Sequence, residues 1–405
     1  MAKPSQFDAI LYTPGSSGTG HFFRIHRLTC ALKKHGISVL TIFGADTIPG
    51  IINRASYAKL ILPRVVFQRG RGLVRNEELL AFYSSIIETC LTHTRPSLFV
   101  YTHHLGISGE LLSPFSNPSL WQKTVRILAW RDLLSSCEEV ERWKKDRSMR
   151  FIEALEKFVD LIVIFGQESL IDARTYFSFP TGVADKICHL GYVTPEASES
   201  QKNSQRLDKD LLISFGSGQH RETLLTTVLP KVLKAAKEMG YTITIYLGLY
   251  WHREQLGPLE RQLNSSDVIR SYTDSVQYLE HLKRCSVAVI AGGYNSLMEA
   301  LYYRTPVIVV EDGTVPEVTA RSEIFEKQGL LSVISSSMRV PDMKLVIREA
   351  ATSRPGKSFQ IDFCGCNRFV QLAKDIIEYG RAADRWASFK QPNNCCTQMS
   401  GTGPL

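Results

Sequence analysis

The sequence predicts an α/β fold of two doubly wound domains, each a parallel sheet with helices on both faces. A chain of 405 residues is long enough for two domains, because single domains usually span about 100–200 residues. Short apolar runs alternate with longer amphipathic segments along the whole chain. Residues 196–210, rich in Ser, Lys, Gln and Asn, interrupt this alternation. This interruption predicts an exposed linker between the two domains.

The first elements of the N-terminal half form a βαβ unit. An apolar strand at Ala9–Thr13 leads into a glycine-rich turn, and a helix follows at His21–His35 with apolar residues at helical spacing. Gly36 ends this helix, and the next strand is expected at Ile37–Phe43. Such a unit implies parallel strands with right-handed crossovers. Further strands are expected near Leu98–Thr102, Ile127–Trp130 and Leu161–Phe165, and helices near Asn76–His93 and Glu138–Phe158.

The alternation starts again after the linker and predicts a second doubly wound domain. We expect domain limits of 1–195 and 211–360, with a C-terminal helix and a flexible tail in 361–405. Ligands of doubly wound folds bind at the carboxyl ends of the strands, so two such domains face each other across a binding cleft. Strands are expected near Leu211–Phe215, Thr242–Leu247, Val268–Tyr272, Val287–Ala291 and Val307–Val310, and helices near Glu222–Met239, Tyr294–Tyr303 and Asn367–Trp386.

The composition indicates a soluble, cytoplasmic protein. No run approaches the roughly 20 apolar residues that span a bilayer, and Asp8 and Pro14 interrupt the only early apolar run. The nine Cys lack paired C-x-x-C spacing, so we expect free thiols and no metal site. The net charge of +8 fits a phosphate-bearing ligand or an anionic membrane. It comes without nucleic-acid-binding motifs, so nucleic acid is not an expected partner.

The strongest local motif is Ala291–Leu301, which follows a buried strand and opens a helix. Gly292 and Gly293 let the backbone approach an anion, and free N–H groups of the first helical turn point towards it. Asn295 and Ser296 can donate to a phosphate, and Glu299, one turn on, can accept hydrogen bonds from ribose hydroxyls. The alternative is an ordinary helix cap with a solvated Glu.

Two further turns are candidate anion sites. Gly15–His21 precedes a helix but lacks both a Lys and the G-x-G-x-x-G spacing of dinucleotide-binding folds. His21 stands at the start of that helix, where a neutral imidazole suits a general base. A structural role for this single His is the alternative. The segment Ser214–Gln219 follows the first strand of the second domain and can supply more N–H donors or form a tight turn.

Taken together, these motifs resemble those of MurG-type glycosyltransferases of the GT-B fold. Gly18–His21 with Arg24, and Gly292–Glu299, match the paired signatures of these enzymes. A nearer match is a bacterial branch of predicted glycosyltransferases, which also has segments similar to Leu105–Leu111, Trp130–Leu133 and His189–Val193. The resemblance extends from about Phe7 to Leu330 and implies two Rossmann-like domains: an N-terminal acceptor-side domain and a C-terminal domain that binds a nucleotide sugar.

The resemblance also implies roles for individual residues. Glu299 would hold the ribose of UDP, the turn at 292–296 would bind the diphosphate, and Glu317 occupies the place that faces the donor sugar. His21 would lie across the cleft near the acceptor, with Asp132 as a candidate orienting partner. The remaining donor-side candidates are Gly216, Ser217, Gly218, Tyr272 and Thr273, and the remaining acceptor-side candidates are Gly18, Thr19, Gly20, Arg24, His103 and His104.

The resulting hypothesis is an inverting, metal-independent transfer from a UDP-sugar, such as UDP-N-acetylglucosamine, to a small-molecule or lipid-linked acceptor. We expect no cofactor. His103 and His104 are candidate metal ligands by residue type, but no D-x-D element accompanies them. The alternatives are a UDP-N-acetylglucosamine 2-epimerase-like enzyme and a non-catalytic nucleotide-binding protein. The segment Gly50–Arg75 carries six basic and no acidic side chains among apolar ones, which suggests peripheral contact with an anionic membrane.

Overall fold

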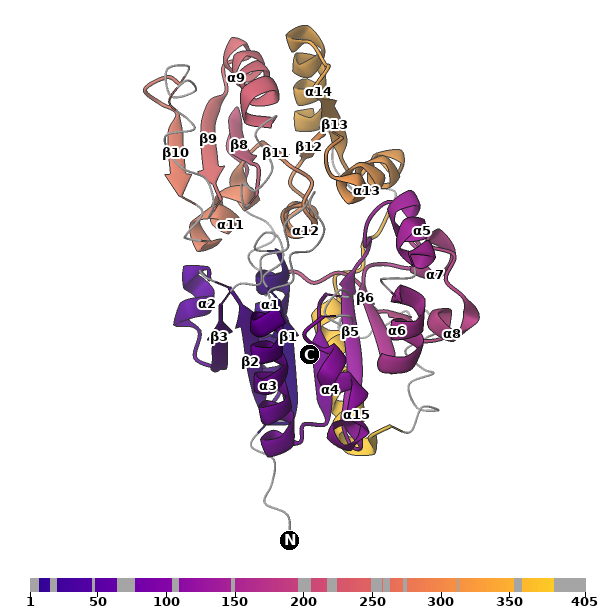
Figure 1. The fold of residues 1–405 in the computed structure, drawn as a ribbon. Coiled ribbons are helices and arrows are strands. Elements are labelled where there is room, and N and C mark those ends of the chain that lie inside the picture. The colour runs from indigo at the N-terminus through magenta and orange to yellow at the C-terminus, as the bar shows by residue number, and fades with distance from the viewer. Residues whose placement is uncertain are drawn as a thin grey trace, which may run out of the picture.

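The computed structural model describes two α/β domains, one above the other in Figure 1. The described residues are 7–14, 20–45, 48–63, 77–103, 109–146, 150–195, 205–216, 224–248, 257, 263–271, 275–311, 313–352 and 359–381. No described helix is both long and apolar enough to cross a membrane. The seven cysteines within these ranges are free thiols.

The N-terminal domain contains a seven-stranded parallel sheet in the order β3-β2-β1-β4-β5-β6-β7. The central strands β1 and β4 are buried along their whole length, because helices cover both faces of the sheet. Its strands are β1 (Ala9–Thr13), β2 (Val39–Gly44), β3 (Ala58–Leu62), β4 (Leu98–Tyr101), β5 (Val125–Arg131), β6 (Leu161–Phe165) and β7 (Ile187–His189).

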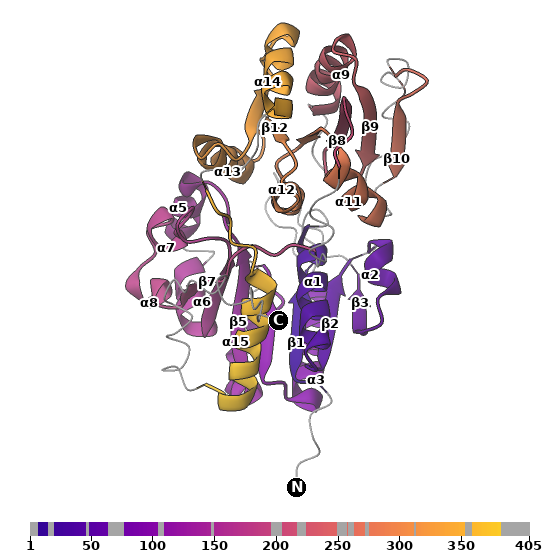
Figure 2. The same ribbon diagram turned by 180° about the vertical axis from the view of Figure 1, so that it is seen from behind.

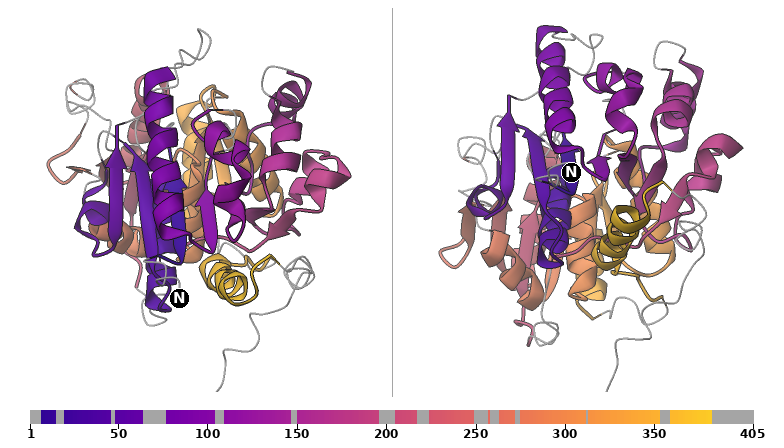
Figure 3. Two further views of the ribbon diagram at one scale, coloured as in Figure 1. Left: turned by 60° about the horizontal axis from the view of Figure 1, so that its bottom comes forward. Right: turned by 90° about the horizontal axis from the view of Figure 1, so that it is seen from below.

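The helices of this domain lie in two layers. Figures 1 and 3 show α3 and α4 on one face of the sheet, and Figure 2 shows α1 on the other. They are α1 (Gly20–Lys34), α2 (Gly50–Arg54), α3 (Glu77–Thr94), α4 (Leu112–Ser116), the 3-10 helix η2 (Pro118–Trp121), α5 (Cys137–Lys145), α6 (Phe151–Phe158), α7 (Ala173–Tyr176) and α8 (Thr181–Ala184).

The C-terminal domain contains a six-stranded parallel sheet in the order β10-β9-β8-β11-β12-β13. Its strands are β8 (Asp210–Ser214), β9 (Thr242–Leu247), β10 (Val268–Ser271), β11 (Val287–Ile290), β12 (Val307–Glu311) and β13 (Ser332–Ser335). Its helices are the π-helix η4 (Leu224–Val228), α9 (Leu229–Glu238), α11 (Ser275–Arg284), α12 (Tyr294–Tyr302), α13 (Pro316–Lys327) and α14 (Val340–Thr352). Figure 1 shows that α11, α12 and α13 lie on the side nearer the N-terminal domain.

The single helix expected at Glu138–Phe158 is wrong, because two helices occupy this stretch. Helix α5 ends at Lys145, and Asp146 has an extended backbone. Helix α6 begins after Arg150, whose φ of 43° is left-handed and incompatible with a continuous right-handed helix. Phe151 and Leu155 of α6 are both buried in the core.

The last described helix, α15 (Gly365–Tyr379), returns to the N-terminal domain. Figures 2 and 3 show it on the face of the N-terminal sheet opposite α3. The rings of Phe369 and Phe165 are in edge contact with centroids 5.8 Å apart. At the start of this helix the chain packs closely against the segment after β7. A Cβ at Gly365 would lie 2.6 Å from the carbonyl oxygen of Gly191. The chain therefore crosses between the domains twice.

Candidate functional site at the domain interface

Two helix N-termini, one from each domain, meet at the interface. Helix α1 follows β1 and begins at Gly20, and α12 follows β11 and begins at Tyr294. The side-chain amide Nδ2 of Asn295 donates a hydrogen bond of 2.9 Å to the carbonyl oxygen of Gly20. The positive ends of both helix dipoles therefore lie at this junction, which favours an anion there.

The turn before α12 depends on glycine. Gly292 has a φ of +67°, and a Cβ there would lie 2.7 Å from methyl carbons of Val309 and Val318. A side chain at this position would clash and would strain the backbone. Among the described residues no side chain caps the N-terminus of α12, so they do not form the ordinary helix cap considered from the sequence.

Glu299 is buried, which corrects the solvated position that the sequence alternative gave it. Only 3% of the residue is exposed, because the second turn of α12 packs against α1. Its Oε1 forms an ion pair with Nη2 of Arg27 on α1. Burial raises the pKa of the Glu299 carboxyl, and Arg27 acts in the opposite direction. This carboxylate thus links the two domains.

Asp132 also forms an interdomain ion pair. It follows β5, and both carboxylate oxygens accept hydrogen bonds from Arg321 of α13 at 2.7–3.1 Å. Both side chains are fully buried. Burial alone would lower the pKa of Arg321, but Asp132 raises it above its ordinary value. Among the described residues, Asp132 contacts Arg321 rather than His21, so the structure does not place it as an orienting partner of His21.

A second ion pair joins the end of β5 to α13. Arg131 at the end of β5 pairs with Glu317 in the first turn of α13. Glu317 also lies 3.8 Å from Arg321, four residues further along the same helix. Arg321 Nη1 donates to the carbonyl oxygen of Gly292 at 3.3 Å. Arg131 and Asp132, at the end of β5, therefore bind Glu317 and Arg321 of α13, and Arg321 in turn binds the glycine turn.

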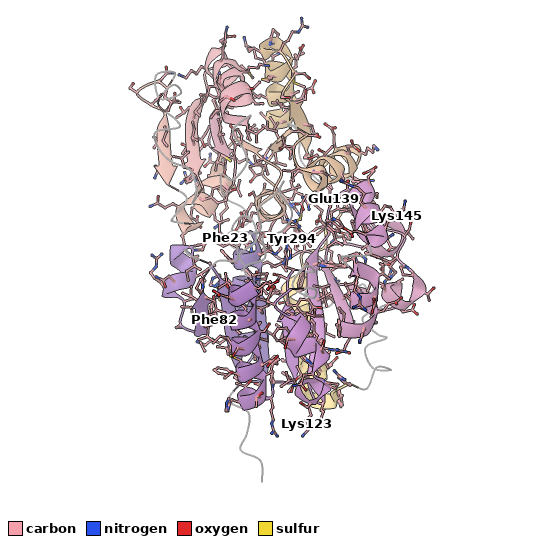
Figure 4. All side chains as sticks on the ribbon, viewed as in Figure 1. Phe23, Phe82, Lys123, Glu139, Lys145 and Tyr294 are labelled. Atoms are coloured by element: carbon pink, nitrogen blue, oxygen red, sulfur yellow. The ribbon has the colours of Figure 1, made fainter. Side chains whose placement is uncertain are left out.

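Tyr294, the first residue of α12, is inserted between the domains, and Figure 4 labels it at their junction. Its hydroxyl donates to the carbonyl oxygen of Phe165 at 2.8 Å and accepts from the backbone N–H of Val193 at 3.2 Å. The guanidinium of Arg321 lies 5.9 Å from its ring centroid. Because both partners of the hydroxyl belong to the N-terminal side, this residue fixes the position of the glycine turn relative to β6.

The acceptor-side candidates form a cluster beside these ion pairs. Nδ1 of His21 lies 3.1 Å from Nη2 of Arg24, and the rings of His21 and His103 have centroids 6.0 Å apart. An Arg can only donate, so Nδ1 is the acceptor, and a neutral His21 carries its proton on Nε2. Burial, with Arg131 and Arg24 nearby, lowers the pKa of His103 to about 4, so His103 is neutral at pH 7. Burial lowers the pKa of Arg24 to about 10.

The structure brings His21, Arg24, His103, Gly292, Asn295, Glu299 and Glu317 to one interface. Gly216 follows β8 with a φ of +71°, which only glycine adopts readily, and Ser296 is partly exposed in the first turn of α12. The predictions for Gly18, Thr19, His104, Ser217, Gly218, Tyr272 and Thr273 fall outside the described residues. No group of three or more described His, Cys, Asp or Glu side chains could hold a metal ion.

Sequence reasoning missed Arg27, Arg131 and Arg321. Each lies within a helix or at a strand end, and none belongs to a glycine motif. The only sequence signal is the i, i+4 spacing of Glu317 and Arg321, which places the two charges on one face of a helix. Their partners lie more than 180 residues away or in the other domain, and no local pattern indicates such pairs.

Comparison with solved structures identifies the architecture. The chain is similar to the glycotransferase of kitacinnamycin (TM-score 0.57, 14% identity, 96% of this chain and 100% of the other) and to LpCGTa in complex with UDP (0.57, 15%, 95% and 100%). It is also similar to MurG of Acinetobacter baumannii (0.56, 10%, 91% and 99%). The fold is GT-B. No protein-family model matches the chain, and no curated protein matches it significantly.

The GT-B fold confirms the predicted class of two doubly wound domains that face each other. In this fold the carboxyl ends of both sheets meet at the interface, where a ligand can contact both domains. The glycine turn before α12 and the start of α1 both lie there. The GT-B fold therefore explains why these residues meet at one interface. The chemistry of the site depends on their side chains and not on the fold.

Proposed function

We propose that this protein is a glycosyltransferase that moves a sugar from a UDP-sugar to a hydroxyl or amine of an acceptor, with inversion and without a metal. The observation that carries the proposal is the meeting of the α1 and α12 N-termini, bridged by Asn295 and Gly20. A diphosphate leaving group develops negative charge, and preorganised N–H groups at a helix start stabilise such charge. The GT-B likeness, including a structure with UDP, agrees with this proposal.

The donor would lie mainly against the C-terminal domain. The Gly292–Ser296 turn would bind the diphosphate, Glu299 would accept a hydrogen bond from the ribose, and Gly216 would leave room for a phosphate at the end of β8. Glu317 would face the sugar. Tyr272 and Thr273, donor-side candidates that fall outside the described residues, would flank the uracil.

The acceptor would lie against the N-terminal domain, where His21 is the proposed base. Nδ1 of His21 accepts from Arg24, so the acceptor hydroxyl must take the place of the Arg24 donor to deliver its proton to Nδ1. The acceptor oxygen then attacks the anomeric carbon, the bond from this carbon to the diphosphate oxygen breaks, and UDP leaves with the electron pair. One displacement of this kind inverts the anomeric centre.

A thermal-shift panel tests the donor. UDP, TDP, GDP and their sugars are added separately to the full-length protein. Selective stabilisation by UDP-sugars supports the proposal, because a ligand that binds only the folded state raises its stability. Stabilisation by TDP compounds alone would reassign the base, and no stabilisation by any of them would favour a non-catalytic protein.

A product assay separates transfer from epimerisation. The preferred UDP-sugar is incubated with the protein, first alone and then with candidate lipid-linked or small-molecule acceptors. A glycosyltransferase releases UDP in step with a new glycoside, whereas an epimerase converts the free UDP-sugar without an acceptor. Retention of the anomeric configuration in the product would contradict the single displacement proposed above.

A further inference from the structure

The ion pair between Arg27 and Glu299 leaves one donor and one acceptor unused. Nη2 of Arg27 binds Oε1 of Glu299. In the part of the chain that the structure describes, Nη1 of Arg27 and Oε2 of Glu299 are buried without a hydrogen-bond partner. Only 4% of the Glu299 side chain and 11% of the Arg27 side chain are exposed. A buried polar atom without a partner is destabilising, more so when it is charged, so this pair calls for a further partner such as a ligand group.

The two unused atoms define the ligand group that fits them. The guanidinium N–H needs an acceptor, and the carboxylate oxygen needs a donor. A hydroxyl offers both functions on one oxygen. A phosphate or carboxylate would be repelled by Glu299, and an ammonium group would be repelled by Arg27. The site therefore selects a neutral hydroxyl.

The position of the pair indicates which hydroxyl. Arg27 belongs to α1 of the N-terminal domain and Glu299 to α12 of the C-terminal domain, and both helices begin at the proposed diphosphate site. Because Arg27 already binds Oε1, one carboxylate oxygen remains for the ligand. A nucleoside diphosphate held at the start of α12 has its ribose hydroxyls within a few bonds of the phosphates.

We propose that Arg27 is a donor-specificity residue, which together with Glu299 binds one ribose hydroxyl of the nucleotide from the opposite domain. This inference rests on the proposed function, because it takes the bound molecule to be a nucleoside diphosphate. It adds that the acceptor-side domain takes part in donor recognition. It also adds that the site distinguishes ribonucleotides from deoxyribonucleotides.

Calorimetric titration of full-length protein with UDP, 2′-deoxy-UDP and 3′-deoxy-UDP tests the proposal. The wild type should bind UDP at least roughly tenfold more tightly than one of the two deoxy compounds, since a charge-assisted hydrogen bond of about 1.5–3 kcal/mol is lost. In Arg27→Met this ratio should shrink at least about threefold, because the hydroxyl loses its donor. The control Lys34→Met, at an exposed position of the same helix, should keep the wild-type ratio.

A second variant covers the case in which Arg27→Met does not fold. Arg27→Lys keeps a positive charge beside Glu299 but not the planar pair of N–H donors, so its ratio should also fall. Equal ratios in the wild type and a folded Arg27 variant would overturn the proposal while leaving UDP binding, and the proposed function, intact. Equal binding of all three compounds by the wild type would overturn this proposal together with the ribose role of Glu299, while UDP binding and sugar transfer would stand. If the wild type bound none of them, the proposed function would fall together with this inference.

Discussion

Replacing Glu299 by Gln removes the charge of the carboxylate and keeps its size. In the structure Oε1 is held by Arg27, so one oxygen is left for the ribose. The substitution therefore changes one charge-assisted hydrogen bond, worth about 1.5–3 kcal/mol, into a neutral one of about 0.5–1.5 kcal/mol. A difference of about 1.4 kcal/mol is a factor of ten, so UDP should bind roughly tenfold more weakly.

The burial of Glu299 changes what is expected of Glu299→Ala. An exposed Glu would contribute little to stability, but here truncation leaves Arg27 without its partner in a nearly closed environment. Removing one member of a buried ion pair costs about 3–5 kcal/mol, and the remaining exposure of Arg27 places the expected loss near the lower limit. Denaturant unfolding of Glu299→Ala should therefore show a loss of about 3 kcal/mol in unfolding free energy.

Isothermal titration of UDP into the wild type, Glu299→Gln and the control Glu349→Gln is the assay. Glu349 is exposed on α14, far along the chain from the glycine turn, and its substitution should change neither affinity nor stability. Equal UDP affinity of folded Glu299→Gln and the wild type would refute the ribose role. In that case the carboxylate would serve only the contact with Arg27.

The pKa of Glu299 adds a pH test. Because the folded-state pKa is raised, the folded protein takes up this proton at higher pH than the unfolded chain. Protonated Glu299 therefore contributes to the stability of the folded state at pH values below the pKa of the unfolded chain. This contribution is lost as the pH rises through the pKa of the folded state. UDP binding, which needs the carboxylate, should instead weaken as pH falls through the raised value, starting above the ordinary 4.5. Glu299→Gln should lack this component, which separates it from protonation of the phosphate.

Other predictions concern the rest of the interface and the surface. His21→Ala should lower turnover by roughly 10²–10⁴ with UDP affinity nearly unchanged, and near wild-type turnover would remove His21 from the mechanism. Asp132→Asn should cost about 3–5 kcal/mol in urea unfolding, because Arg321 is fully buried; a loss below about 1 kcal/mol would contradict this. Phe369→Ala should destabilise the N-terminal domain by about 3–5 kcal/mol, measured by calorimetry, whereas an unchanged transition would mean that α15 packs loosely. Through the segment 50–75, the protein should sediment with anionic liposomes, less in high salt than in low salt, and no binding at low salt would refute membrane contact.

The membrane prediction is only partly described by the structure. Helix α2 and strand β3 belong to the segment, and residues 64–76 lie outside the described ranges. Two apolar side chains of the edge strand β3, Leu60 and Ile61, are 37% and 47% exposed. Basic and apolar side chains together are what an anionic bilayer binds, so the liposome test addresses the whole segment.

The fold class and most of the described strands follow from the sequence alone. Buried strands such as Leu161–Phe165 are continuous apolar runs, and the helix that starts near His21 has its apolar residues at helical spacing. Both are local patterns, because the backbone repeats every 2 or 3.6 residues. The glycine turn at Gly292–Gly293 was also predictable, since a left-handed φ in a crowded turn requires glycine itself.

The ion pairs of the interface could be recognised only in the tertiary structure. Glu299 could be assigned to the start of a helix from its spacing, but its burial and its pairing with Arg27 depend on how α12 packs against α1. In the same way, Asp132 has Arg321 as its partner because the end of β5 meets α13 across the interface. Ion pairs between residues distant in sequence leave no periodic trace, since electrostatic energy depends on distance in space and on burial.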